Sequence, residues 1–293
     1  MYSHLNEPNI LRRMNKYDLG IKLISSFKDY ENIYLITTLF EGKSLGYYKD
    51  EILDEDKVKF ISACIIQNFI YIRKENIIHR DVRFENIIMD ANKYFNIIDF
   101  SCSIDYNSKN NLNYYVITDI NVISPERNSS KTYDFNSDYY EFGSLLYYLL
   151  FKTFPNIIKT NKNISNISIK YTQNHNYSSN CIDFINKLII DNQKERIGYK
   201  DVNELKNHQW FKGFNWDKLE KKLIISPFKF INDSFKNTKC YKFQITDLMI
   251  NTFKNNSKIL VFKEMLKNYD FADVDIIERN KYKNNKNIFH KLS

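Results

Sequence analysis

Hydrophobic residues recur with the period of an α-helix in two long segments of the chain. The first predicts a helix over residues 56–74, with Asp56 as its candidate N-terminal cap; its apolar positions are spaced by three or four residues, at Val58, Ile61, Ile65, Phe69 and Ile72. The second, over residues 137–151, is strongly apolar. Two such helices are expected at the centre of a mainly helical body.

Shorter elements are expected on both sides of these helices. Residues 21–27 and 33–39 predict two strands, and the polar turn at residues 28–32 joins them into a hairpin whose outer edge is open. The other expected elements are a helix at 3–14, short strands at 87–89 and 96–98 around a turn at 90–92, an irregular segment at 156–177, and helices at 178–190 and 201–208. The periodicity weakens beyond about residue 230.

Composition narrows the class of protein. The 293 residues carry a formal net charge of +8, with lysines spread along the chain and densest near its end, which we interpret as a solvated surface and tail and not as a nucleic-acid-binding face. The four cysteines lack metal-ligand spacing and favour a reducing cytosol, so we expect a cytoplasmic protein. The longest apolar runs, such as Leu145 to Phe151, are too short to span a bilayer, and no membrane association is expected.

An ordered set of motifs suggests phosphoryl transfer. That chemistry needs an acceptor for the proton of the substrate hydroxyl and oxygen ligands for magnesium. A His-Arg-Asp loop with a trailing Asn, and an Asp-Phe pair after a buried strand, can supply both. In chain order the motifs are His79-Arg80-Asp81, Asn86, Asp99-Phe100, Ser124-Pro125-Glu126, Asp138 and Arg196. Each is weak alone, and their common order carries the hypothesis.

With these motifs the chain resembles the protein kinase fold, an α+β fold, and within it the AGC group of cyclic-AMP- and cyclic-GMP-dependent serine/threonine kinases. Three further stretches carry the resemblance: the segment from Leu5 to Leu35, the segment Lys206–Phe211, and the segment Gly213–Leu219, which resembles the start of an AGC tail. The resemblance covers roughly residues 3–230. It implies a remnant of the N-lobe (helix C, two strands and the hinge) at 1–42, a mainly helical C-lobe at 43–211, and an AGC-like tail with a Lys/Asn-rich extension at 212–293.

The resemblance also implies a role for individual residues. In the catalytic loop Asp81 would be the base, Asn86 and Asp99 the magnesium ligands, and Arg83 would stand where the family has a lysine. ATP binding would involve the gatekeeper Thr37, the hinge residues Thr38, Leu39 and Phe40, and Glu85 and Asp99; Glu85 is also the acidic position that remains for reading arginines in a substrate. The scaffold would comprise Glu7 of helix C, His79, Arg80, Phe100, Asp119, Glu126, Asp138 and Arg196, with Glu126 paired to Arg196 and Asp138 tethering the catalytic loop. His79 and Phe100 would stack in a regulatory spine with Leu11 and Leu23.

Several positions depart from the family pattern. Met1 falls inside the expected helix C, and neither a glycine-rich loop nor the strand-three lysine precedes it in this sequence, so we expect weak binding of Mg-ATP and a turnover at least roughly a thousandfold below that of intact kinases. Asp119 replaces a threonine that contacts the catalytic aspartate. A planar guanidinium suits a carboxylate, so one expectation is that Arg83 and Asp119 form an ion pair; the alternative is unconstrained drift at both positions.

The first functional hypothesis is therefore a serine/threonine kinase that uses ATP and Mg²⁺ on a protein substrate. Its expected partners are a regulatory subunit or a missing N-terminal segment. The alternative is a pseudokinase, in which the kinase fold serves as a protein-binding or regulatory module. A nucleic-acid binder is a distant third possibility, since it would need a contiguous basic face with interleaved aromatic residues.

Overall fold

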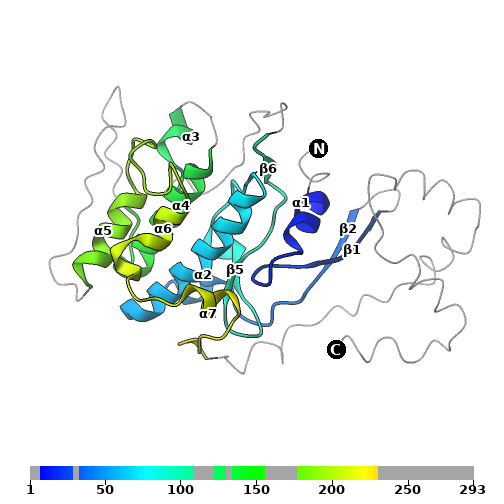
Figure 1. Cartoon of the computed structure of the whole chain (residues 1–293), viewed down its shortest axis with the longest axis horizontal. Helices are drawn as coiled ribbons and strands as arrows, with labels where there is room; N and C mark the ends of the chain where they lie inside the picture. The colour runs from blue at the N-terminus through cyan, green and yellow to red at the C-terminus, as the bar shows by residue number, and fades with distance from the viewer. Residues whose placement is uncertain (1–6, 29–32, 108–121, 130–133, 156–176, 230–293) are drawn as a thin grey trace, which may run out of the picture. The chain divides into compact units, whose positions relative to one another are not determined.

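The computed structural model describes residues 7–28, 33–107, 122–129, 134–155 and 177–229 (Figure 1). These residues belong to two compact units. The smaller is a hairpin of the antiparallel strands β1 (Leu23–Lys28) and β2 (Ile33–Thr37), close to the predicted strands. The larger contains all the other described elements. The irregular segment expected at 156–177 lies almost entirely outside the described residues.

The two predicted central helices are present in the larger unit as α2 (Glu55–Lys74) and α4 (Phe135–Phe151). The expected cap of α2 is wrong: Asp54, not Asp56, accepts a hydrogen bond from the backbone N–H of Lys57, at 2.8 Å. Asp54 has the extended backbone that an N-cap requires, whereas Asp56 already lies in the first helical turn. Asp134 caps α4 in a reciprocal arrangement with Ser137, so this helix begins two residues before its predicted start.

Short antiparallel sheets flank these helices. Strands β4 (Ile87–Met89) and β5 (Phe95–Ile97) pair as predicted around a turn, in which the Asp90 carboxylate accepts hydrogen bonds from the N–H groups of Asn92 and Tyr94. Strands β3 (Ile77–Ile78) and β6 (Ile104–Asp105) form a second pair, which the sequence pattern did not predict because each has only two residues.

Smaller helices complete the larger unit. Helix α5 (Ser179–Leu188) packs against α4, while α6 (Asn203–Asn207) and α7 (Trp216–Glu220) pack against α2. The others are α1 (Glu7–Met14), α3 (Pro125–Ser129), and the 3₁₀ turns η1 (Leu45–Tyr48), η2 (Phe84–Asn86) and η3 (Gln209–Phe211). The described residues thus form a mixed α+β structure with several helices and small antiparallel sheets, in agreement with the expected class.

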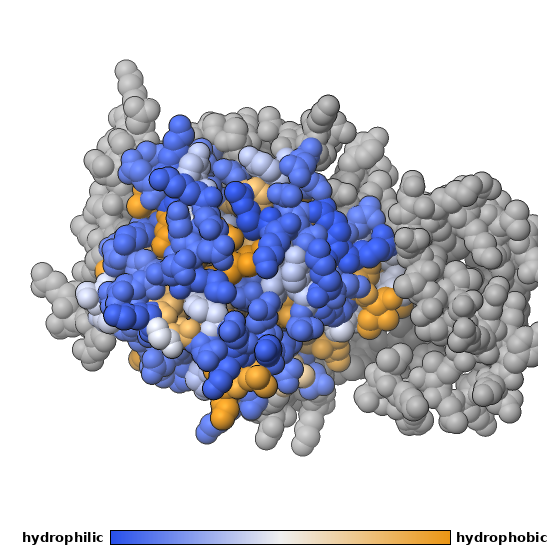
Figure 2. All heavy atoms as spheres, viewed as in Figure 1, coloured by the Kyte–Doolittle hydropathy of each residue, from blue (hydrophilic) through white to orange (hydrophobic). Residues whose placement is uncertain are grey.

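The surface of the described residues is mainly polar on the face drawn in Figure 2, where apolar side chains occur in small separate groups. Large apolar side chains that are strongly exposed include Ile52 and Ile225. Among the described helices, none combines the length and the apolar character needed to cross a membrane.

The contact between α4 and α5 depends on a glycine. A Cβ added at Gly143 would lie 2.6 Å from the Cβ of Leu188 and 3.0 Å from Cγ1 of Ile189. Both neighbours are fully or almost fully buried, so they have little room to move. Gly143 therefore allows the two helices to approach closely.

We expect Gly143→Ala to lower the free energy of unfolding by about 1–2 kcal/mol, because overpacking outweighs the gain in helix propensity. Denaturant unfolding followed by circular dichroism measures this change. Gly46→Ala is the matched control, since its new Cβ would meet no atom closer than 3.4 Å. Equal stability of the two variants would contradict the tight α4–α5 contact.

Candidate active site

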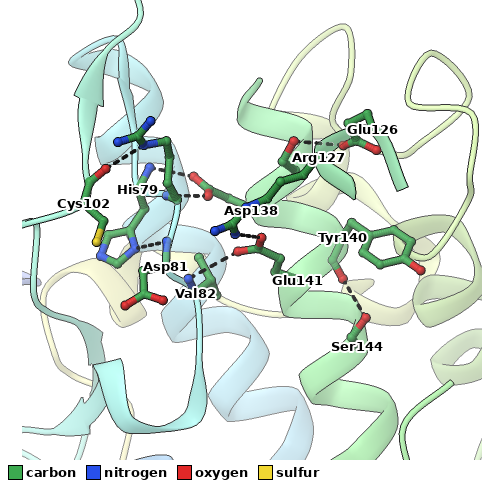
Figure 3. A network of polar contacts seen from close by, with 12 residues as sticks. His79, Asp81, Val82, Cys102, Glu126, Arg127, Asp138, Tyr140, Glu141 and Ser144 are labelled. Atoms are coloured by element: carbon green, nitrogen blue, oxygen red, sulfur yellow. Dashed lines mark hydrogen bonds and ion pairs between the residues drawn. The ribbon is translucent and has the colours of Figure 1, made fainter. Parts of the chain in front are cut away.

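The loop between β3 and β4 is held by one buried carboxylate. Asp138, in the first turn of α4, accepts hydrogen bonds from the backbone N–H groups of His79 and Arg80, each at 2.8 Å (Figure 3). Burial raises the pKa of Asp138, and the two N–H donors and the nearby His79 act in the opposite direction. The expected tether between Asp138 and the His-Arg-Asp loop is thus present as a contact.

One residue in this loop and one in the turn next to it have left-handed backbones, which residues other than glycine rarely adopt. Arg80 has φ of +69° and Asp99 has φ of +61°. The conformation of Arg80 is maintained by its bond to Asp138 and by its Nε, which donates to the Cys102 carbonyl at 2.6 Å. Such strain persists only where surrounding contacts over-determine it, and it is typical of functional loops.

Asp81 and Asn86 lie side by side in this loop. The Asn86 amide nitrogen donates to the Asp81 carboxylate at 2.7 Å and to the Asp81 carbonyl at 3.0 Å. Both residues are largely buried, each with 8% exposure, so the pair has a fixed geometry at the edge of solvent. Because the nitrogen makes both bonds to Asp81, the amide oxygen of Asn86 is the atom suited to bind a cation.

The Asp99-Phe100 turn joins the same region. The N–H of Ile98 donates to the Asn86 carbonyl at 2.9 Å, which brings Asp99 next to the loop. The Asp99 side chain is exposed and accepts from the Ser101 N–H at 3.2 Å. Phe100 is buried and meets the His79 ring edge-on, with ring centroids 5.0 Å apart. The expected contact between Phe100 and His79 is therefore present.

Glu7 of α1 contacts this turn from the other side. Its carboxylate accepts a hydrogen bond from the N–H of Phe100 at 3.1 Å. Burial raises the pKa of Glu7 to about 7; the negative charge of Asp99 adds to the rise, and the bond from Phe100 opposes it. This contact was not predicted from the sequence, because 93 residues separate the two partners.

Arg83 pairs within its own loop. Its Nε lies 2.9 Å from the Glu85 carboxylate, and both side chains are substantially exposed. The hydrogen bond to Glu85 is the main cause that raises the pKa of Arg83. Asp119 lies outside the described residues, so the expected pair between Arg83 and Asp119 stays a prediction.

The expected contact between Glu126 and Arg196 is also present. Two nitrogens of the fully buried Arg196 guanidinium donate to the two Glu126 oxygens at 2.8 and 3.0 Å. This fork-to-fork geometry fixes α3 against the segment that follows α5. Arg196 holds the pKa of Glu126 below its ordinary value, although burial alone would raise it.

The residues expected to bind the adenine of ATP are divided between the two units. Thr37 and Thr38 belong to the hairpin unit, whereas Leu39 and Phe40 belong to the larger one. Leu39 is 71% exposed, so its side chain is not part of the apolar core. Their role in nucleotide binding stays a prediction.

The side-chain oxygen atoms of Asn86 and Asp99 are the type of ligand that magnesium prefers. In the part of the chain that the structure describes, no three His, Cys, Asp or Glu side chains gather to hold a metal. Mg²⁺ bound with a nucleotide, however, ordinarily uses one or two carboxylates, together with phosphate oxygens and waters. The Asp99 carboxylate and the Asn86 amide oxygen, on two backbone segments joined by the Ile98–Asn86 hydrogen bond, meet that smaller requirement.

Two site residues were missed by sequence reasoning. Glu141 of α4 and Arg127 of α3 are buried and paired beside the loop (Figure 3). The available signal was a single acidic residue in the middle of a strongly apolar helix, since a buried carboxylate needs a partner.

Comparison with known proteins identifies the family. The family model described as "Protein kinase domain" matches residues 2–211, well over half of the chain. The chain therefore belongs to the protein kinase domain family. It has distant homology to the cGMP- and cAMP-dependent kinases of the AGC group.

Three relatives illustrate the distance. The Drosophila melanogaster cGMP-dependent protein kinase, isozyme 2 (forms cD5/T2), is 28% identical over 217 residues, which cover 71% of this chain and 23% of the relative. Human cGMP-dependent protein kinase 2 is 29% identical over 215 residues, 71% of this chain and 28% of the relative. The cAMP-dependent protein kinase type 3 of Saccharomyces cerevisiae is 27% identical over 234 residues, 77% and 58% respectively. The chain thus spans less than two thirds of each.

The raised pKa of Glu7 generates a stability prediction. The folded protein holds this proton up to about pH 7, whereas the unfolded chain loses it near pH 4.5, so the charged carboxylate destabilises the fold increasingly between these pH values. We expect Glu7→Gln, which can still accept from Phe100, to stabilise the protein at pH 8 by about 1 kcal/mol, a value reduced for solvent screening of a half-buried side chain, and by much less at pH 5. Thermal unfolding of both proteins at the two pH values measures the difference. A stability change of the same size at pH 5 and pH 8 would show that the charge of Glu7 is not the cause.

Proposed function

We propose that this chain is the catalytic part of an AGC-type serine/threonine protein kinase that transfers the γ-phosphate of ATP to hydroxyl groups of protein substrates. The observation that carries the proposal is the Asp81–Asn86 pair, with an Asn86 nitrogen 2.7 Å from the Asp81 carboxylate on a loop tethered by Asp138. A proton acceptor and a magnesium ligand are thereby held together, as phosphoryl transfer requires. Family membership supports this assignment.

Each site residue has a definite part in this proposal. Asp81 accepts the proton of the substrate hydroxyl, and the bond from Asn86 orients its carboxylate. Asn86 and Asp99 would hold Mg²⁺ through their side-chain oxygens. A metal bound there would supply positive charge to stabilise the phosphate oxygens of ATP. Thr37 to Phe40 would border the adenine, with Thr37 as gatekeeper.

The finer domain assignment follows the same proposal. Residues 43–211 would form the mainly helical C-lobe, with α2 and α4 at its centre. Helix α1 and the β1–β2 hairpin would be helix C, two strands and the hinge of the N-lobe, within residues 1–42. Residues 212–293 would be the AGC-like tail and its extension. The proposal includes a regulatory subunit or a further N-terminal segment as a partner. It also places the protein in the cytosol.

The substrate preference would differ from that of kinases which favour basic peptides. Glu85 is the acidic position that remains for reading arginine in a substrate, but Arg83 lies 2.9 Å from it. A carboxylate already paired with a cation attracts a second cation less strongly. We therefore propose protein substrates without a strict requirement for basic residues.

Substitution of the two aspartates tests the proposal. We expect Asp81→Asn to lower the transfer of labelled phosphate from ATP to a general protein substrate by about 10²–10⁴-fold, because the proton acceptor is lost, while binding of Mg-ATP changes little. Asp99→Asn should weaken both transfer and the magnesium-dependent part of ATP binding. Radiolabel transfer and titration calorimetry measure the two effects. Asp217→Asn, an exposed carboxylate of α7, is the control and should behave as wild type.

The pseudokinase alternative gives a different result in the same experiment. A wild-type chain that neither binds Mg-ATP nor transfers phosphate would exclude the proposed activity. Transfer that persists at the wild-type rate in Asp81→Asn would exclude Asp81 as the proton acceptor.

A further inference from the structure

Glu141 is a carboxylate in the core of the larger unit. It lies in the middle of α4, and its side chain is 1% exposed. Burial raises its pKa, as does the negative charge of Asp138 one helical turn earlier, while the charge of Arg127 opposes the rise. Burying such a group strongly destabilises a fold unless the group is paired and hydrogen-bonded. The two contacts of the Glu141 carboxylate therefore indicate its structural role.

The two oxygens of Glu141 face two different parts of the protein. On one side, Nη1 of Arg127 from α3 donates to Oε1, and this guanidinium side chain is itself only 3% exposed. On the other side, the backbone N–H of Val82, the residue after Asp81, donates to Oε2 at 3.4 Å. Figure 3 shows Glu141 between Arg127 and Val82, on the same side of α4 as Asp138.

With this contact, every backbone N–H from residue 79 to residue 82 has an acceptor. Those of His79 and Arg80 donate to Asp138, and that of Asp81 donates to Nδ1 of His79 at 3.3 Å. Glu141 takes the fourth, that of Val82. Two carboxylates of α4 thus hold the backbone on both sides of Asp81. The Val82 bond is the longest of the four, at 3.4 Å.

The charge partner of Glu141 comes from α3. Arg127 follows Glu126, which forms the fork-to-fork pair with Arg196. Adjacent residues of one short helix therefore make two buried ion pairs, one to α4 and one to the segment after α5. Glu141 has a compensated charge only while α3 is docked against α4.

We propose that Arg127 and Glu141 form a positioning pair for Asp81: Glu141 holds the backbone N–H next to Asp81, and Arg127 keeps the Glu141 oxygens in place from α3. Neither residue touches the reacting atoms. Through this pair the position of α3 is coupled to the alignment of the proposed proton acceptor. The kinetic part of this inference rests on the proposed kinase function.

Two double variants separate positioning from stability. Arg127→Met with Glu141→Gln removes both charges but keeps an oxygen that can accept from Val82. Arg127→Met with Glu141→Met removes the charges and the acceptor in a side chain of the same length. We expect similar melting temperatures for the two, a kcat at least about tenfold lower in the Met/Met variant with the KM for ATP unchanged, and faster amide exchange over residues 79–86 in that variant.

The outcomes are distinguishable. Equal kcat and equal amide exchange in the two double variants would overturn the proposal and leave the pair with a structural role. If the wild-type chain transfers no phosphate, the proposed function fails, but the exchange rates of residues 79–86 still decide whether Glu141 holds the loop. If neither double variant folds, exchange in the wild-type protein decides: protection of the Val82 amide comparable to that of His79 and Arg80 supports the proposal, and a freely exchanging Val82 beside protected neighbours overturns it.

Discussion

The carboxylate of Asp138 is the constraint on which the candidate site depends. One side chain accepts the N–H groups of two successive residues, His79 and Arg80, at 2.8 Å each. Its place in the first turn of α4 lets the helix dipole stabilise the negative charge that burial disfavours. Because the two bonds fix the left-handed backbone of Arg80, they also determine the position of the next residue, Asp81. Removal of this one acceptor would leave two buried N–H groups unsatisfied in the loop that carries the proposed chemistry.

Buried charges extend this constraint into a network that joins four parts of the chain: the loop, α3, α4 and the segment that carries Arg196. Asp138 and Glu141 hold the loop from α4, and Arg127 and Glu126 connect α4 through α3 to Arg196. Buried ion pairs contribute little net stability compared with apolar packing, but removal of one partner is strongly destabilising. Such pairs therefore favour one arrangement of α3, α4 and the loop over others. A fixed arrangement is what a proton acceptor and a magnesium ligand require.

Long, periodic elements were predictable from the sequence, and contacts between distant residues were less so. Helices α2 and α4 were expected within two residues of their bounds because apolar spacing defines them. The cap of α2 was misplaced because Asp54 and Asp56 are both good capping residues, and the backbone conformation selects between them. The pairs Asp138 with residues 79–80 and Glu126 with Arg196 were expected through family resemblance, and both contacts are present.

Other features could not be read from local pattern. The β3–β6 pair has two residues per strand, too few to produce a periodic signal. The Glu7–Phe100 bond joins residues 93 positions apart, and its donor is a backbone group that any residue type provides. The role of Glu141 was missed because the helix pattern around it is apolar, and because the arginine that compensates its charge lies outside that helix.

The location of a bound metal tests most directly whether this loop is built for phosphoryl transfer. The measurement is a crystal structure of the chain with Mn²⁺ in place of Mg²⁺ and a non-hydrolysable ATP analogue, in which anomalous scattering identifies the metal. We expect a metal peak at coordination distance from the Asp99 carboxylate and the Asn86 amide oxygen, with the Asp81–Asn86 hydrogen bond retained. A nucleotide-bound structure whose metal lies away from both residues would contradict the assignment of this loop as the catalytic loop of a kinase.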